Sequence, residues 1–332
     1  MRASEAMESL SPEKAALSPE QAALSLTPEM RRNFAVVVPA LNEAPVIPHL
    51  ISALKEAFRT FQLQGEVILV DDGSTDGTAE LAEREGEGWA SLRVLRHRIN
   101  LGKTEAMVTA SQATEKDFLV LFDADLQHSP QEIPRFLARL QEGWDMVTGR
   151  KVGSYEKPFV SSLYNWLSRR IFRVPVSDLN SMKAFRRCIL QDITLRHDWH
   201  RFFVVLAHAR GYSVTELDIR LHPRKAGVSK YSGRFRIVVG LMDLISVWFL
   251  LLFSRKPLML FGFSGVVLIG LGLVVGGVAF YLRYVEGMGF RPLLYLVVLL
   301  ETVGFLLLGV GLLAEMVAHL QHEVDALRRR SR

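Results

Sequence analysis

The chain has little that would build a disulfide-bonded or zinc-bound domain, because Cys188 is its only cysteine. A single cysteine excludes an internal disulfide framework and any zinc site made of several thiolates. No helix-turn-helix, zinc-finger or RNP pattern is present, so we expect no nucleic-acid partner. No apolar stretch follows Arg2, so we do not expect a signal peptide there.

Charged residues are missing from one long apolar stretch and nearly missing from a second. Residues 258–282 contain no charge, and residues 293–314 contain only Glu301. Each stretch is long enough to cross a bilayer of about 30 Å. Lysine and arginine cluster before the first stretch and after the second, which predicts that both termini and the globular part are cytoplasmic. Glu301 is either a contact between helices or a functional group.

Acidic residues are missing from residues 219–242, where six lysine and arginine residues are found. A basic segment next to membrane spans favours a phosphate or lipid-headgroup site over a DNA site. Within it, Arg224, Lys225 and Lys230 surround the permissive Gly227 and are suited to wrap a diphosphate. A basic loop at the membrane surface is the alternative, and both interpretations can hold together.

The length of 332 residues is typical of about two domains. Residues 1–33 carry Ser/Thr-Pro-Glu helix-start signals, but each piece is too short to be a stable helix alone. We therefore predict five parts: a flexible N-terminal extension over 1–33, an α/β domain over 34–233 with an amphipathic interface helix at about 158–173, a juxtamembrane amphipathic helix over 234–256, a two-helix transmembrane domain over 257–316 and a basic cytoplasmic tail over 317–332.

From Phe34 onward, strand and helix patterns alternate. This alternation predicts an α/β fold with a mostly parallel sheet, whose ligands bind beyond the carboxyl ends of the strands. The expected strands are 34–38, 66–70, 92–96, 117–122 and 145–148, and the expected helices are 46–61, one ending at 85, 103–114 and 131–141.

Acidic residues follow three of these strands, and Glu43 of PALNE is the one after the first strand. Asp123 and Asp125 come after the fourth strand, and on extended chain both carboxylates would point the same way. With Gln127 they form an oxygen-rich set suited to Mg²⁺ or Mn²⁺. Asp71 and Asp72 follow the second strand and suit hydrogen bonds to a base or ribose, although the adjoining residues also fit a tight turn with a helix cap.

The motifs in order resemble the family 2, GT-A-fold glycosyltransferases, and within them the polyprenyl-phosphate branch of dolichyl-phosphate mannosyltransferases and undecaprenyl-phosphate glucosyltransferases. The resemblance covers about residues 34–253. It implies a GT-A (Rossmann-like) domain followed by amphipathic interface helices and two transmembrane helices. The motifs are PALNE at 39–43, DDGSTDGT at 71–78, NLGK at 100–103, DADLQH at 123–128, TGR at 148–150 and RKAGVSKY at 224–231.

The resemblance also implies roles for individual residues. Asp123, Asp125 and Gln127 would bind the metal, with Asp123, Asp125 and Arg150 at the reacting centre. Arg150 would meet the acceptor phosphate, and Arg169 or Arg186 would replace a second arginine of the family. The nucleotide-sugar contacts would be Pro39, Leu41, Glu43, Val70, Asp71, Asp72, Asp123, Ala124, Gln127, Arg224 and Lys230.

The implied reaction is metal-dependent, inverting transfer of a hexose from a nucleotide-diphospho-sugar of the GDP-mannose or UDP-glucose type to a polyprenyl phosphate. It would take place at the cytoplasmic face of a lipid bilayer, and a homo-oligomer is compatible with the sequence. One alternative is transfer to a lipid or glycan hydroxyl, with Asp198 as the base. A remote alternative is a membrane-anchored scaffold without catalysis.

Overall fold

The computed structural model describes residues 17–152, 175–176, 178–179, 181–193, 195, 199–222, 249, 257–289 and 291–330. The chain forms two compact units, Met1–Val238 and Val239–Arg332. The interface helix predicted at about 158–173 lies outside the described residues, as does the juxtamembrane helix predicted at 234–256 apart from Phe249.

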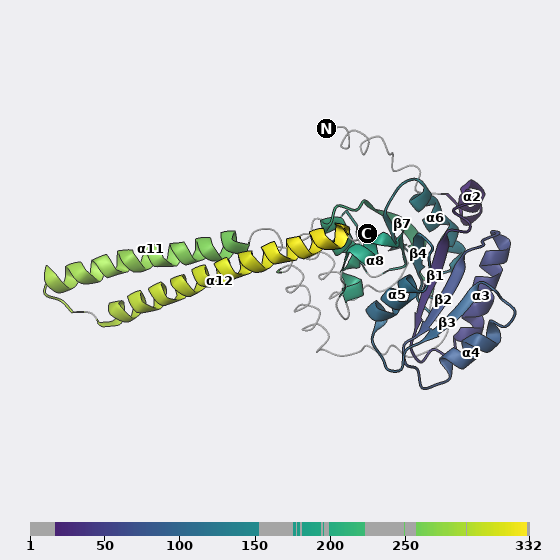
Figure 1. The fold of residues 1–332 in the computed structure, drawn as a ribbon, viewed down its shortest axis with the longest axis horizontal. Coiled ribbons are helices and arrows are strands. Elements are labelled where there is room, and N and C mark those ends of the chain that lie inside the picture. Colours follow the sequence, from purple (N-terminus) through teal and green to yellow (C-terminus); the bar gives the residue numbers. More distant parts are fainter. Residues whose placement is uncertain are drawn as a thin grey trace. The chain divides into compact units, whose positions relative to one another are not determined.

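The described strands of the first unit form one seven-stranded sheet (Figure 1). β6 runs antiparallel to both of its neighbours, and the other strand pairs are parallel. The other six strands therefore end at one edge of the sheet, which confirms the predicted α/β fold. The spatial order is β3 (Leu92–Arg96), β2 (Glu66–Asp71), β1 (Phe34–Ala40), β4 (Phe118–Leu121), β6 (Lys183–Arg186), β5 (Met146–Val152) and β7 (Val214–Arg220).

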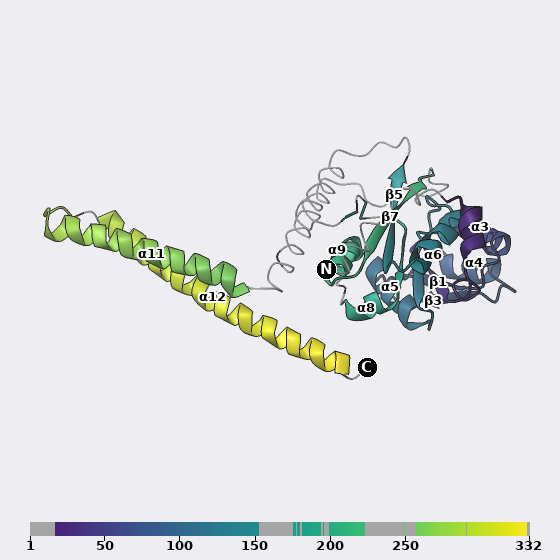
Figure 2. The ribbon, with the colours of Figure 1, turned by 90° about the horizontal axis from the view of Figure 1, so that it is seen from above.

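Helices cover both faces of this sheet, which is why its central strands are almost continuously apolar. The side chains of Phe34–Val38 in β1 are all buried. Figure 2 shows α5, α8 and α9 on one side of the sheet and α3 and α4 on the other. The helices are α3 (Ile47–Thr60), α4 (Thr78–Glu85), α5 (Lys103–Gln112), α6 (Ile133–Gln141), α8 (Cys188–Asp192) and α9 (Phe203–Ala209), with 3-10 turns at η2 (Pro130–Glu132) and η3 (Trp199–Arg201).

The described part of the predicted N-terminal extension is packed on the first unit. Ser18 caps α2 (Pro19–Ser25) in a capping box with Gln21, as the Ser-Pro-Glu signal predicts. Ala22 and Ala23 are buried, and α2 packs against α6. The backbone N–H of Thr27 donates to Gln141 Oε1 at 2.8 Å. Burial against α6 gives this short helix the stability that it would lack in isolation.

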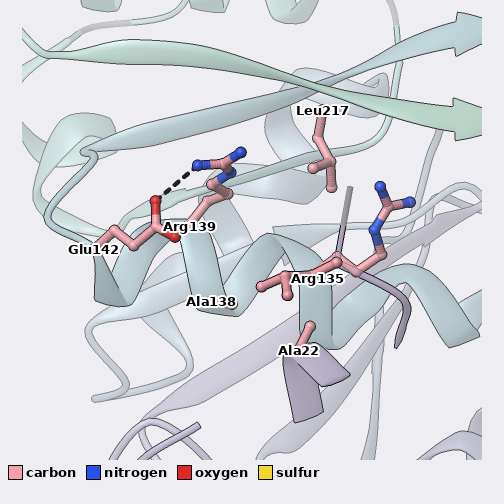
Figure 3. A pocket seen from close by; sticks show the side chains of 7 residues that line it. Ala22, Arg135, Ala138, Arg139, Glu142 and Leu217 are labelled. Atoms are coloured by element: carbon pink, nitrogen blue, oxygen red, sulfur yellow. Dashed lines mark hydrogen bonds and ion pairs between the residues drawn. The ribbon is translucent and has the colours of Figure 1, made fainter. Parts of the chain in front are cut away.

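A small pocket lies where α2 and α6 meet β7 (Figure 3). Ala22, Ala138 and Leu217 form its apolar walls, and Arg139 pairs with Glu142 beside it at 2.8 Å. None of the predicted site residues lines this pocket, so it belongs to the packing of α2 and not to the acidic loops.

The second unit is a hairpin of two long helices, α11 (Pro257–Tyr284) and α12 (Arg291–Arg330). Both are long and apolar enough to cross a membrane, over Pro257–Tyr284 and Arg291–Leu320. The prediction of two C-terminal apolar helices is confirmed. α12 continues through most of the segment predicted as a tail, because that segment is rich in good helix formers.

Candidate functional site

The loops after β1 and β2 are bound to each other at the carboxyl edge of the sheet. The backbone N–H of Asn42 donates to Ser74 Oγ at 2.8 Å, and that of Glu43 donates to Thr78 Oγ1 at 2.9 Å. Asn42 adopts a left-handed φ of 50°, and its side-chain oxygen accepts from Thr75 N. The PALNE and DDGSTDGT motifs are therefore joined to each other at this edge of the sheet.

The carboxylate of Asp72 holds the loop that follows β3. Its Oδ1 accepts from Leu101 N at 2.9 Å and lies 2.8 Å from His97 Nδ1. Its Oδ2 accepts from Gly102 N at 2.8 Å. Asp72 is buried, so in this structure it organises the NLGK loop. Its predicted contact with a nucleotide stays a prediction.

The other residues of β1, β2 and their loops that are predicted to contact the nucleotide differ in solvent accessibility. Pro39, Leu41 and Glu43 are half-buried at the end of β1. The side chain of Val70 is fully buried, so a contact there would use its backbone. Asp71 is buried, and its Oδ1 accepts from Ser74 N at 3.1 Å.

The DADLQ segment is a turn and not the extended chain that we expected. Ala124 and Asp125 form the turn, and Leu126 has a left-handed φ of 53°. Asp125 Oδ1 accepts from Gln127 N at 3.1 Å, a side-chain bond that favours turns over strand continuation. The two carboxylates are therefore positioned by this turn and not by strand alternation.

Asp123 is paired with Lys103, the first residue of α5. The ammonium of Lys103 donates to Asp123 Oδ1. Burial opposes ionisation of Asp123, but the charge and hydrogen bond of Lys103 outweigh it and lower the pKa of this carboxyl group below its ordinary range. Asp123 is thus an anion in the absence of any ligand. Sequence reasoning quoted NLGK as a motif but assigned no role to Lys103.

Two further ionisable residues lie beside Asp123: His128, which ends the DADLQH motif, and Lys183, which no sequence motif contains. Burial lowers the pKa of His128 to about 4, although the charges of Asp123 and Asp125 oppose this shift. Burial also lowers the pKa of Lys183 to about 7, helped by the nearby charge of Lys103. Lys183 opens β6 opposite Leu121 of β4, and its ammonium donates to Ser181 O at 2.8 Å. The sequence signal is a lysine inside the apolar stretch 182–185, where a charged side chain is uncommon.

The chain that leads into the basic segment returns to the acidic turn. The backbone N–H of His222, two residues after β7, donates to Gln127 O at 2.8 Å. The segment that carries Arg224 and Lys230 starts at this contact. Arg224 and Lys230 themselves lie outside the described residues, as do Arg169 and Asp198.

Arg150 and Arg186, both predicted for the acceptor site, lie towards opposite edges of the sheet. Arg150 of β5 makes a two-point ion pair with Asp218 of β7, at 2.5 and 2.8 Å, which raises the pKa of the guanidinium. Arg186 ends β6 opposite Phe118, the first residue of β4, and pairs with Asp145. Because β6 is antiparallel, Arg186 lies at the far edge from Asp123. This position does not favour a contact of Arg186 with the acceptor phosphate, which stays a prediction.

The carboxylates of the acidic turn fit a divalent cation whose remaining ligands come from a substrate. Among the described residues, no three His, Cys, Asp or Glu side chains gather into a metal site. Mg²⁺ and Mn²⁺ are commonly held by one or two carboxylates together with substrate phosphates. Asp123 and Asp125 meet that requirement, and the lysine bound to Asp123 shows that the site already attracts a cation.

A mostly parallel sheet with acidic loops at its carboxyl edge defines an α/β protein whose candidate ligand site lies at that edge. The model of the family "Glycosyl transferase family 2" matches residues 35–206, which is just over half of the chain. The chain belongs to glycosyl transferase family 2 and is a glycosyltransferase.

Named relatives match nearly the whole chain. The dodecaprenyl-phosphate galacturonate synthase of Rhizobium johnstonii is 31% identical over 315 residues, covering 90% of this chain and 91% of its own. The undecaprenyl-phosphate 4-deoxy-4-formamido-L-arabinose transferase of Pseudomonas fluorescens is 29% identical, covering 88% and 86%.

The solved structures show the same fold at lower identity. Glucosyl-3-phosphoglycerate synthase of Mycobacterium tuberculosis, in complex with Mn²⁺, UDP and glucosyl-3-phosphoglycerate, has a TM-score of 0.55 and 20% identity. The match covers 69% of this chain and 84% of that one. The GT-A fold is confirmed by this likeness.

Proposed function

We propose that this glycosyltransferase moves a sugar from a nucleotide-diphospho-sugar to a polyprenyl phosphate, with Mg²⁺ or Mn²⁺ and with inversion at the anomeric carbon. The observation that carries this proposal is the convergence of three loops at one sheet edge. The joined PALNE and DDGSTDGT loops offer a nucleotide wall, the DADLQ turn offers two carboxylates, and His222 bonds the start of the basic segment to Gln127.

The chemistry of these loops suits the departure of a nucleoside diphosphate. A bound divalent cation would neutralise charge as the diphosphate leaves, with Asp123 and Asp125 holding that cation. Arg224 and Lys230, on the segment that begins beside Gln127, would bind diphosphate oxygens. A phosphate acceptor is already ionised near neutral pH, because its second pKa is about 6. It needs orientation and no general base, and Arg150 is proposed to supply that orientation.

The acceptor is proposed from the relatives, whose names specify dodecaprenyl and undecaprenyl phosphate. Those names include galacturonate and a formamido-arabinose, so the hexose expected from the sequence is one choice among several. Transfer to such a lipid places the reaction at a membrane surface. We propose that α11 and α12 span the bilayer, with both termini and the first unit on the cytoplasmic side.

The test is transfer of radiolabel from a panel of UDP- and GDP-sugars to undecaprenyl phosphate by the full chain in detergent. The panel includes glucose, mannose, a uronic acid and a formamido-arabinose. Each donor is tested with Mn²⁺ and with excess chelator. We expect one donor to give a labelled lipid that disappears with chelator. A labelled lipid that persists with chelator would contradict metal dependence, and no lipid product with any donor would contradict the proposed acceptor.

A variant of Asp198 distinguishes the proposed phosphate acceptor from a hydroxyl acceptor. Transfer to a hydroxyl needs a base, and Asp198 is the residue that the sequence suggests for it. Asp198→Asn should leave phosphate-acceptor transfer largely intact. Strong loss of transfer in this variant, with the protein still folded, would move the proposal to hydroxyl chemistry.

A further inference from the structure

Lys103 stands at the junction of the two acidic loops. Asp72, after β2, accepts the N–H of Gly102 at 2.8 Å, and the next residue, Lys103, donates its ammonium to Asp123 after β4. Gly102 has a φ of 88°, a left-handed value that a side chain rarely allows. The hydrogen bond from Gly102 to Asp72 therefore helps to set where α5 begins, and this start of α5 places Lys103 beside Asp123.

This position is unusual for a lysine on electrostatic grounds. A cation in the first turn of a helix is unfavourable, because the helix dipole is positive at that end. Gly102, the N-cap of α5, provides no side-chain cap to offset it. The negative charge of Asp123 compensates Lys103, and the pair is only partly exposed, with side-chain accessibilities of 25% and 36%. The pair is therefore partly buried beside the acidic turn.

We infer that Lys103 is a diphosphate-binding residue that occupies Asp123 only while the donor is absent. The inference rests on the proposed metal-dependent reaction. An ammonium and a divalent cation compete for the same carboxylate, so binding of Mn²⁺ at Asp123 displaces Lys103. The flexible four-carbon stem then lets the ammonium turn to the diphosphate that arrives with the metal. Lys103 would thereby oppose metal binding without donor and favour donor binding with metal.

The test measures two affinities on the full-length chain in detergent. Binding of Mn²⁺ alone is followed by electron paramagnetic resonance, and binding of UDP and of GDP at saturating Mn²⁺ is followed by calorimetry. Three variants are compared with the wild type: Lys103→Gln, Lys103→Arg and Lys116→Gln. Lys116 is the matched control, because it faces Glu66 at 3.8 Å with 29% accessibility, away from the acidic turn.

We expect Lys103→Gln to shift the two affinities in opposite directions. Mn²⁺ alone should bind about fivefold more tightly, because a partly exposed ion pair no longer competes for Asp123. The nucleoside diphosphate should bind about tenfold more weakly, because one charge-assisted hydrogen bond is lost. Lys103→Arg keeps the charge and should stay close to the wild type, as should Lys116→Gln.

Three outcomes would overturn the inference. Unchanged or weaker Mn²⁺ binding in Lys103→Gln would show that no competition occurs, and unchanged nucleotide binding would show that Lys103 does not meet the diphosphate. Equal losses of both affinities in Lys103→Gln and Lys103→Arg, with a lower melting temperature, would assign the lysine to folding. A wild type that binds no Mn²⁺ would instead refute the metal-dependent reaction itself, and the two failures are therefore distinguishable.

Discussion

The two units of the chain place similar apolar sequences in opposite surroundings. Phe34–Val38 of β1 is completely buried between layers of helices. On α11, Met259 and Phe263 are 72% and 71% exposed. Large apolar side chains gather in the core of the first unit, whereas in the hairpin they point away from the partner helix. The large exposed apolar surface of the hairpin supports the proposed membrane spans, since such a surface is not stable in water.

The two units also differ in what makes their internal contacts. The sheet and its helices meet through large side chains, but α11 and α12 approach each other at glycines. A Cβ at Gly265 would lie 2.6 Å from Gly304 O, and one at Gly272 would lie 2.7 Å from Glu301 Oε1. Small residues at such contacts are typical of helices that pack within membranes. Glu301 therefore makes a contact between the helices, one of the two roles that the sequence left open.

The largest expected effect is on catalysis in the first unit. Asp125→Asn should lower transfer about a thousandfold or more, because several kcal/mol of charge stabilisation depend on the metal ligands. Folding and membrane insertion should persist, because Asp125 lies in a turn at the sheet edge. The measurement is the initial rate of label transfer to undecaprenyl phosphate, with circular dichroism as a check of folding.

Asp117→Asn is the matched control for this variant. Asp117 precedes β4, at the opposite end of the strand from the acidic turn, and accepts a hydrogen bond from Asn33 at 2.8 Å. Its substitution should leave the transfer rate nearly unchanged. Similar losses in both variants would show that the acidic turn has no special role.

The next prediction concerns the stability of the hairpin of α11 and α12. Gly265→Ala should destabilise it by about 1–3 kcal/mol, because the added methyl group would collide with the backbone of α12. Gly270→Ala adds the same group where nothing lies within 4 Å, so it should be tolerated. Thermal unfolding of the full chain in nanodiscs measures both. Equal behaviour of the two variants would refute the glycine contact.

A pH-dependent effect is expected from the buried lysine of the first unit. Burial lowers the pKa of Lys183 from 10.5 to about 7. Between these values the unfolded state binds the additional proton, so the stability of the wild type should rise with pH by up to about 1.4 kcal/mol per pH unit. Lys183→Met removes this dependence and should be more stable than the wild type below about pH 7. If the melting temperatures of the wild type and of Lys183→Met changed with pH in the same way, the lowered pKa of Lys183 would be contradicted.

The smallest effect concerns the attachment of α2. Ser18→Ala removes the capping box and should destabilise this helix by about 1 kcal/mol, seen as faster proteolytic cleavage near residue 25. Leu24→Ala is the control within the same helix, because Leu24 is 82% exposed. The interpretation fails if Leu24→Ala is cleaved as fast as Ser18→Ala.

Much of the first unit could be predicted because its sequence pattern and its structure agree. Continuous apolar runs such as Val67–Val70 predict buried parallel strands, and the acidic residues that follow them mark the carboxyl edge. The two apolar helices followed from the absence of charge. These features depend on local sequence, so local reasoning was sufficient.

The missed parts depend on contacts between distant residues. Nothing in the sequence shows that β6 runs antiparallel, and that reversal brings Lys183 to the site and takes Arg186 to the far edge. The pairing of Lys103 with Asp123 joins positions 20 residues apart and arises only once α5 is set against the sheet. The chain turns at Asp125, beyond the predicted strand 117–122, because the side chain of Asp125 accepts a hydrogen bond from Gln127 N.

The most direct measurement compares undecaprenyl phosphate with undecaprenol as acceptors for the same labelled donor and the full chain. The two lipids share their isoprenoid tail and differ only in the group that attacks the sugar. We predict a labelled product with the phosphate and none with the alcohol. A labelled product with undecaprenol, or equal transfer to both, would contradict transfer to a lipid phosphate.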